Sequence, residues 1–120
     1  MEHNRLTEIK NYYIDILINF KNVYLDYPFD NSDWAAIRHN DNKKIFALIY
    51  IRNEKVCINF KNEPMWGTFW RESFECVTPA YHMNKEHWST VYIGEDASEQ
   101  QIIDMVTESY KLTESKRKKK

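Results

Sequence analysis

The side chains best suited to binding chemistry are concentrated in residues 81–90, which hold two His and one each of Lys, Asn, Tyr and Trp. Lysine pairs with phosphate, aromatic rings stack on bases, and an asparagine amide forms hydrogen bonds. One interpretation is a binding hairpin that uses Lys85, Asn84 and either Tyr81 or Trp88. In the structural alternative the aromatic rings enter the core and Asn84 forms the turn. The sequence leaves both interpretations open.

Further cations fall at expected strand ends and turns. If they form one basic patch, strands and turns build it rather than the last helix, because residues 61–115 hold four basic against ten acidic side chains. The alternative is an ordinary solvated surface. These cations are Arg38, Lys43, Lys44, Arg52, Lys55, Lys61 and Lys85.

Catalytic and metal-binding patterns are weak in this sequence. His82 and His87 are five residues apart and His39 could join them, but no carboxylate or cysteine stands at a recognised metal-ligand spacing. Cys57 is placed in mid-strand and Cys76 has no activating neighbour. Two glycines in the whole chain cannot form a phosphate-binding loop. We therefore expect a protein that is not an enzyme and that holds no metal and no cofactor.

The formal net charge of −1 is the sum of two unlike parts. Residues 1–115 carry 12 basic against 18 acidic side chains, whereas Lys116–Lys120 are all basic. We expect one domain over residues 1–113 and a disordered basic tail over residues 114–120. Such a tail adds non-specific attraction to nucleic acid.

The expected cellular location follows from the segments and residue patterns that the sequence lacks. No apolar run approaches the roughly 18–20 residues of a membrane span, and the N-terminus lacks the basic and apolar regions of a signal peptide. Two cysteines are too few for a disulfide framework. We expect a monomer in the reducing cytoplasm, with no membrane partner.

The helices that must carry these residues are marked by spacing and caps. Apolar residues from Leu6 to Phe20 recur at intervals of three and four, which predicts an amphipathic helix. Asn62 is a good N-cap for a second helix with Pro64 just inside it. Ser98 with Gln101 predicts a capping box for the third. The predicted helices are 5–21, 62–73 (with Trp66, Phe69 and Trp70 on one side) and 99–113.

Five strands complete the prediction. The segment 45–51 is apolar on both faces, as expected of a central strand, and short turns between strands imply antiparallel pairing. Residues 26–33 are expected to form turns. The result is an α/β fold of the α+β type, in the order α-β-β-β-α-β-β-α, with a five-stranded antiparallel sheet and helices packed on one face. The predicted strands are 34–38, 45–51, 56–60, 77–83 and 88–93.

Four stretches of the sequence resemble the MmcQ/YjbR family. The segment from Val77 to Val91 closely resembles the hallmark segment of that family, and residues 43–49 and 56–61 resemble its paired strands. Residues 102–110 resemble its closing helix. The resemblance implies a CyaY-like fold, which agrees with the predicted order of elements. It also implies a small bacterial cytoplasmic protein without enzymatic activity, with a proposed DNA-binding role through a double wing of strand hairpins.

Two departures from the family pattern bear on function. The resemblance puts Lys43 and Lys44 in one wing and His82, Asn84, Lys85 and Trp88 in the other. Glu86 stands where related sequences often have Arg or Lys, which removes a cation from this second wing. Segment 62–74, with Trp66 and Trp70, replaces a Leu-rich helix. The iron association of CyaY does not carry over, because the first helix holds only Glu8 and Asp15 as acids.

The function expected from these observations is DNA binding through basic strand hairpins. The alternative is a protein-binding or small-ligand-binding module that uses the open sheet face around Tyr81, His82 and Trp88. The candidate DNA-binding residues are Arg38, Lys43, Lys44, Lys61, His82, Asn84, Lys85 and Trp88.

Overall fold

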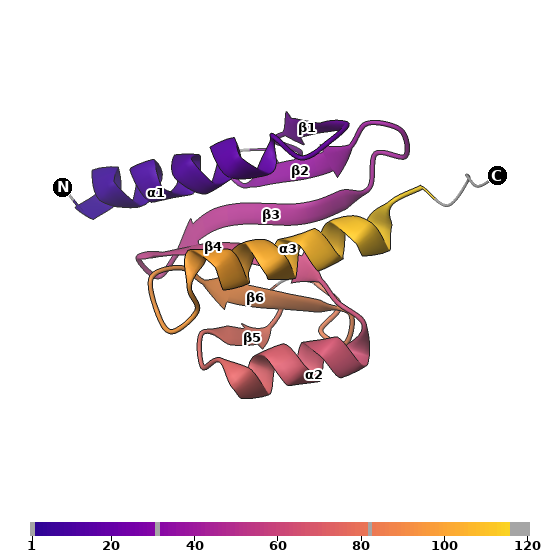
Figure 1. Ribbon diagram of the computed structural model, residues 1–120. Helices are drawn as coiled ribbons and strands as arrows, with labels where there is room; N and C mark the ends of the chain where they lie inside the picture. Colours follow the sequence, from indigo (N-terminus) through magenta and orange to yellow (C-terminus); the bar gives the residue numbers. More distant parts are fainter. Residues whose placement is uncertain (1, 31, 82, 116–120) are drawn as a thin grey trace.

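An antiparallel sheet of six strands, in the order β1-β2-β3-β4-β6-β5, forms the centre of the computed structural model (Figure 1). The structure describes residues 2–30, 32–81 and 83–115, with side chains from Asn4 onward. The elements are α1 (Glu2–Leu17), β1 (Val23–Asp26), β2 (Ala35–His39), β3 (Ile45–Arg52), β4 (Lys55–Lys61), α2 (Pro64–Ser73), β5 (Val77–Pro79), β6 (Trp88–Tyr92) and α3 (Glu99–Thr113).

The α/β class, the antiparallel pairing and the helices on one face are confirmed, but the number of strands is six rather than five. The additional strand is β1, which pairs with β2 from Val23↔His39 to Asp26↔Ala36. It lies at the edge of the sheet and none of its four residues is fully buried. A short edge strand without a buried face lacks the alternation by which strands are predicted.

Three predicted element ends were also wrong. Helix α1 stops at Leu17 rather than at residue 21, and Asn22 has a positive φ of 63°. Strand β5 stops at Pro79 rather than at residue 83. The N-cap of α2 is Glu63, not Asn62, although Pro64 does begin the helix. By contrast, Ser98 and Gln101 form the predicted capping box of α3.

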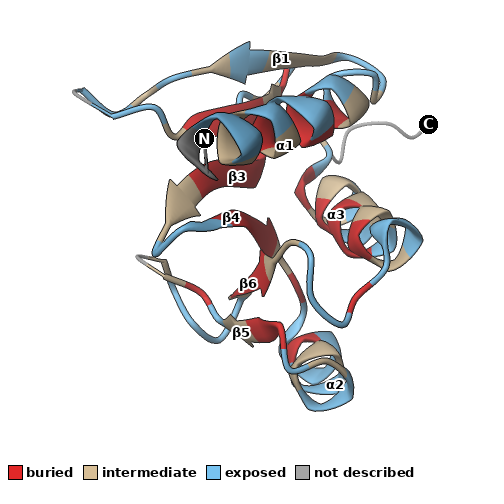
Figure 2. Ribbon diagram, turned by 90° about the vertical axis from the view of Figure 1, so that its left-hand side faces the viewer, coloured by how far each residue is buried: buried red, intermediate tan, exposed pale blue. Residues whose placement is uncertain are grey.

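The main core lies between the sheet and the helices. Figure 2 shows the three helices on one side of the sheet, with α1 and α3 over β3 and β4 and α2 at the β5 edge. Phe46, Ile49, Ile58 and Phe60 are fully buried in this core. The aromatic side chains of α2 are buried only in part, since Trp66 and Phe69 are about half exposed.

A β-bulge in β3 breaks the regular alternation of side chains. Ile37 pairs with Ala47 and Arg38 pairs with Ile45, which leaves Phe46 without a partner on β2. Two residues therefore oppose one, and the alternation resets at that point. Phe46 and Ala47 both enter the helix-side core, while Ile45 packs with the opposite face.

The face of the sheet that points away from the helices is here called the outer face. It is built on Ala36, Leu48, Tyr50 and Cys57. The β1–β2 and β5–β6 connections both extend on this side of the sheet (Figure 2). From the first connection, the Trp34 ring stacks on Tyr50 at a centroid distance of 3.9 Å.

The β5–β6 connection is fixed to the outer face by buried polar contacts around Asn59. Tyr50 and Thr90 donate hydroxyl hydrogen bonds to Asn59 Oδ1, at 2.7 and 2.6 Å. Asn59 Nδ2 donates to the Tyr81 carbonyl at 3.0 Å. The Arg52 guanidinium also lies 3.8 Å from the centroid of the Tyr81 ring. A buried amide with this many partners stabilises one arrangement strongly, because each broken contact leaves a polar group unpaired.

A second buried asparagine, Asn62, explains why position 67 of α2 is a glycine. Asn62 Oδ1 accepts a hydrogen bond from Ser89 Oγ at 2.6 Å, and Asn62 Nδ2 donates to the Glu63 carbonyl at 3.0 Å. A Cβ atom added at Gly67 would lie 2.8 Å from Asn62 Cγ and 2.9 Å from an Arg71 guanidinium nitrogen. Glycine at position 67 therefore allows α2 to approach this asparagine closely.

Replacement of this glycine distinguishes packing from helix propensity. Propensity alone predicts that Gly67→Ala raises the free energy of unfolding by about 1 kcal/mol. We expect it instead to lower that free energy by about 1–2 kcal/mol, because Asn62 is held by its hydrogen bonds and cannot move aside. Urea unfolding followed by circular dichroism measures the change. Thr68→Ala, at an exposed position of the same helix, is the control and should not destabilise. A stabilised Gly67→Ala variant would contradict the close approach.

Candidate nucleic-acid interface

Four cations from three parts of the chain line one pocket of about 310 Å³. Its walls are completed by Trp88, Ile45, Met83 and Thr113. We call it the basic pocket; its cations are Arg38, Lys43, Lys44 and Lys61. Five of the eight candidate residues predicted from the sequence therefore lie together.

The sheet register places these side chains in one row. Arg38 on β2 pairs with Ile45 on β3, and Lys61 on β4 pairs with Trp88 on β6. Lys61 lies two residues from Asn59, so both side chains point to the outer face. The row crosses four strands at the end of the sheet where the β2–β3 hairpin turns.

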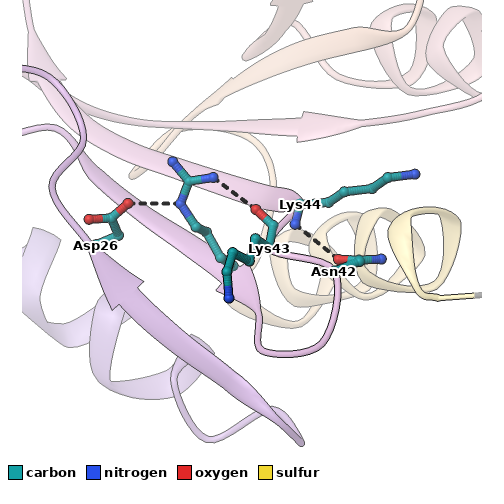
Figure 3. Close-up of polar contacts among 5 residues, drawn as sticks. Asp26, Asn42, Lys43 and Lys44 are labelled. Carbon is teal, nitrogen blue, oxygen red and sulfur yellow. Dashed lines mark hydrogen bonds and ion pairs between the residues drawn. The ribbon is translucent and has the colours of Figure 1, made fainter.

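Arg38 is held by neighbours within the protein (Figure 3). Its Nε donates to Asp26 Oδ2 at 2.8 Å, and a terminal nitrogen donates to the Lys43 carbonyl at 2.8 Å. It therefore orders the β2–β3 hairpin and shares its charge with Asp26. Because an arginine that is already paired has fewer free donors, we assign it a supporting role in the pocket.

Lys43 and Lys44 are displayed by the hairpin turn. Lys43 has a φ of 64°, and the backbone N–H of Lys44 donates to Asn42 Oδ1 at 2.9 Å. Both lysine side chains are exposed. Among the described residues, no carboxylate forms an ion pair with Lys43, Lys44 or Lys61. Their charges are therefore not neutralised within the described part of the chain.

Of the remaining three candidates, the two that the structure describes, Asn84 and Lys85, do not line this pocket. Asn84 Oδ1 accepts hydrogen bonds from the backbone N–H groups of Glu86 and His87, at 2.9 and 3.2 Å, which is the turn-forming alternative for this residue. Lys85 is exposed on the same connection and does not line the pocket. His82 and the tail Lys116–Lys120 lie outside the described residues.

The cations of the β3–β4 turn are used for internal contacts. Lys55 forms an ion pair with Glu95, and Arg52 packs on Tyr81. These two residues lie at the other end of the sheet from Lys61. The basic pocket is therefore a local feature of the β2–β3 hairpin end.

His39 connects this end of the sheet to α3. A hydrogen bond of 2.8 Å links His39 Nε2 and Thr113 Oγ1, and Asn42 Nδ2 donates to the Thr113 carbonyl at 2.9 Å. Burial lowers the pKa of the His39 imidazole below its usual value, and the carboxylates of Asp41 and Glu114 offset this effect in part. Neutral His39 therefore stabilises the fold around the basic pocket.

The stability should consequently depend on pH. Because the folded pKa of His39 lies below the unfolded value of about 6.5, the unfolded state takes up a proton first as the pH falls. The stabilisation is complete well above pH 6.5 and is lost as the pH falls through 6.5 toward the folded pKa. We expect the free energy of unfolding to fall between pH 7.5 and 5.5, and to fall less in His39→Gln. His87→Gln, at an exposed position, is the control; equal pH dependence in both variants would refute the assignment.

The two cysteines are buried and unpaired. Burial raises the pKa of Cys57 to about 12 and that of Cys76 to about 11. The thiolate is the reactive form, so neither thiol is suited to nucleophilic attack near neutral pH.

Thiol labelling tests this assignment. At pH 8 an aromatic disulfide reagent should label neither cysteine of the native protein within minutes, because the thiols are protonated and shielded. Both should react at once after unfolding in guanidinium chloride. Rapid labelling of the native protein, followed by mass spectrometry of the modified peptide, would show a reactive thiol and contradict it.

A second pocket of the outer face was missed by the sequence analysis. It has a volume of about 400 Å³ and is lined by Phe29, Ser32, Trp34, Ile45, Leu48 and Met83. We call it the apolar pocket. The sequence offered one signal, since the segment 45–51 was apolar on both faces. The other walls come from connections whose path over the sheet depends on tertiary contacts.

The fold defines a class of small α/β proteins with an antiparallel sheet and helices on one face, and this chain carries a basic pocket at the β2–β3 hairpin end of that sheet. The family model described as YjbR matches residues 18–112, and the chain belongs to this family. No helix among the described residues is long and apolar enough to cross a membrane.

Relatives and solved structures agree with this assignment. The chain is 31% identical over 96 residues to "Uncharacterized protein YbdF" of Escherichia coli O157:H7, covering 77% of this chain and 79% of the relative. It is 31% identical over 99 residues to "Uncharacterized protein YyaQ" of Bacillus subtilis strain 168, with 73% and 83% covered. A crystal structure of a Pseudomonas syringae protein superposes with a TM-score of 0.78 at 30% identity, over 87% of this chain and 97% of that one.

Proposed function

We propose that this chain is a non-enzymatic DNA-binding protein that holds the DNA backbone in its basic pocket. The observation that supports the proposal is the gathering of Arg38, Lys43, Lys44 and Lys61 around one pocket, although the chain carries a negative net charge. Phosphate contacts from lysine and arginine supply most of the sequence-independent affinity for DNA.

Each part of the pocket has a role in this mechanism. Lys43 and Lys44 extend from the hairpin turn and pair with successive phosphates, while Lys61 pairs with a phosphate from the sheet side. Trp88 is half-buried beside Lys61 and supplies an apolar surface for a deoxyribose ring. Arg38 keeps the hairpin in place through Asp26.

The C-terminal sequence adds basic residues a few positions along the chain from the pocket. Thr113 lines the pocket, and the basic residues Lys116–Lys120 begin three positions later in the chain. If all five charges met duplex phosphates, they would add ~4–5 units to the salt dependence of binding. We also infer a cytoplasmic location, which unpaired cysteines favour, and binding as a monomer.

Fluorescence anisotropy with a labelled duplex tests the proposal across several salt concentrations. We expect Lys43→Ala/Lys44→Ala to weaken binding about tenfold near 100 mM salt. The slope of log affinity against log salt should fall by about 2, because two phosphate contacts are lost. Arg5→Ala/Lys55→Ala removes the same charge from exposed positions that do not line the basic pocket, and is the matched control.

A chain that ends at Ser115 separates the pocket from the basic residues after it. We expect this shorter chain to keep measurable affinity that Lys61→Ala weakens further. Complete loss of binding in the shorter chain, with unchanged binding in the Lys43→Ala/Lys44→Ala full-length variant, would show that residues 116–120 alone are responsible. The basic pocket would then have no role in DNA binding.

A further inference from the structure

The apolar pocket is a preformed hollow whose floor belongs to the sheet. Leu48 is almost fully buried in that floor, and Trp34 is fixed in one wall by its stacking on Tyr50. Phe29 packs edge-on against Trp34 at a centroid distance of 5.9 Å. The volume of the apolar pocket, about 400 Å³, is within the range of small-molecule sites, which are mostly apolar with few polar groups.

Part of the apolar surface of this pocket lies outside the two hydrophobic core clusters and is exposed to solvent. Phe29 is 47% exposed even though its ring packs edge-on against Trp34. Such surface is costly to leave in water, and burying it under a ligand is favourable.

The apolar pocket continues into the basic pocket. Ile45 and Met83 line both, so the two are adjacent on the outer face. Among the described residues, no carboxylate lines either one. A ligand that fills the first pocket can therefore present a negative group to Lys44 and Lys61 in the second.

The few polar groups in the walls of the apolar pocket restrict which classes of ligand it can bind. Ser32 is the one hydroxyl among the described lining residues of the apolar pocket, and its Oγ already accepts a hydrogen bond from the Trp34 backbone N–H at 3.1 Å. A nucleobase would find too few partners for its polar edges among the described lining residues, at a cost in affinity. A cationic ligand would be repelled by the adjacent lysines.

We propose that the apolar pocket binds a small organic anion, with an alkyl or aryl body in the apolar pocket and a carboxylate against the cations of the basic pocket. The anion would occupy lysines that also contact DNA. It would therefore compete with DNA, a consequence that rests on the proposed function.

Calorimetric titration of the full-length protein with octanoate, 1-octanol and acetate tests the proposal. We expect octanoate to bind at least tenfold more tightly than 1-octanol, and acetate to give no measurable binding. These ligands separate the contribution of the apolar body from that of the charge. Equal affinity for octanoate and 1-octanol, or no binding of octanoate, would overturn the proposal.

Two pairs of variants locate the site. Phe29→Ala should weaken octanoate and 1-octanol alike, about tenfold, whereas Tyr27→Ala, a control of similar exposure in the same segment, should weaken neither. Lys44→Gln/Lys61→Gln should reduce octanoate binding to the level of 1-octanol and leave 1-octanol unchanged, and Arg5→Gln/Lys55→Gln should change neither.

Methyl NMR gives a second measurement that needs no variant. Octanoate should shift the methyl signals of Met83 and Leu48. Binding without these shifts would place the ligand elsewhere and refute the proposal. These readouts do not involve DNA, so failure of DNA binding leaves them intact. If both sites are correct, octanoate displaces labelled DNA and acetate at the same concentration does not.

Discussion

The β-bulge between β2 and β3 is the constraint on which the rest of the outer face depends. In a regular strand Phe46 and Ala47 would point to opposite faces. The unpaired position of Phe46 allows both to enter the core, where the Phe46 ring packs on His39 and Tyr110. The same shift brings Ile45 opposite Arg38 on the other face. One extra residue thus completes the core and also places the wall that both pockets share.

Two buried asparagines, Asn59 and Asn62, hold the β5–β6 connection by hydrogen bonds. Asn59 fixes the β5–β6 connection on the outer face, and Asn62 fixes the same connection at its other end by binding Ser89 and the Glu86 carbonyl. An apolar contact would allow the connection to slide, whereas these hydrogen bonds are directional. The position of Met83, and so the shape of both pockets, depends on this anchoring.

Most of the fold could be predicted from sequence because its long elements carry strong periodic patterns. Strands β3 and β4 and helix α3 have apolar spacing or caps that local rules recognise, and their observed ends agree closely with prediction. Strand β1 could not be predicted, since its stability comes from pairing with β2 rather than from its own pattern. The same holds for the site. The lysines were identified by type, but Arg38, Lys61 and Trp88 come together only through the register, and Asn84 proved to be a turn residue.

A basic pocket on a protein of negative net charge is not a contradiction, because screening makes electrostatics local. At physiological ionic strength charges more than about 8 Å apart interact weakly across water. The acids Asp15, Glu99 and Asp104 lie on helices that cover the opposite side of the sheet, in a molecule whose shortest dimension is 25 Å. An anion at the outer face therefore experiences Lys43, Lys44 and Lys61 far more than these distant acids. Asp41 and Glu114, whose carboxylates act on His39 at the same end of the sheet, offset part of the lysine charge. In dilute salt the net charge does act at long range. The acids on the helix side should therefore repel an approaching anion most strongly where screening is weakest.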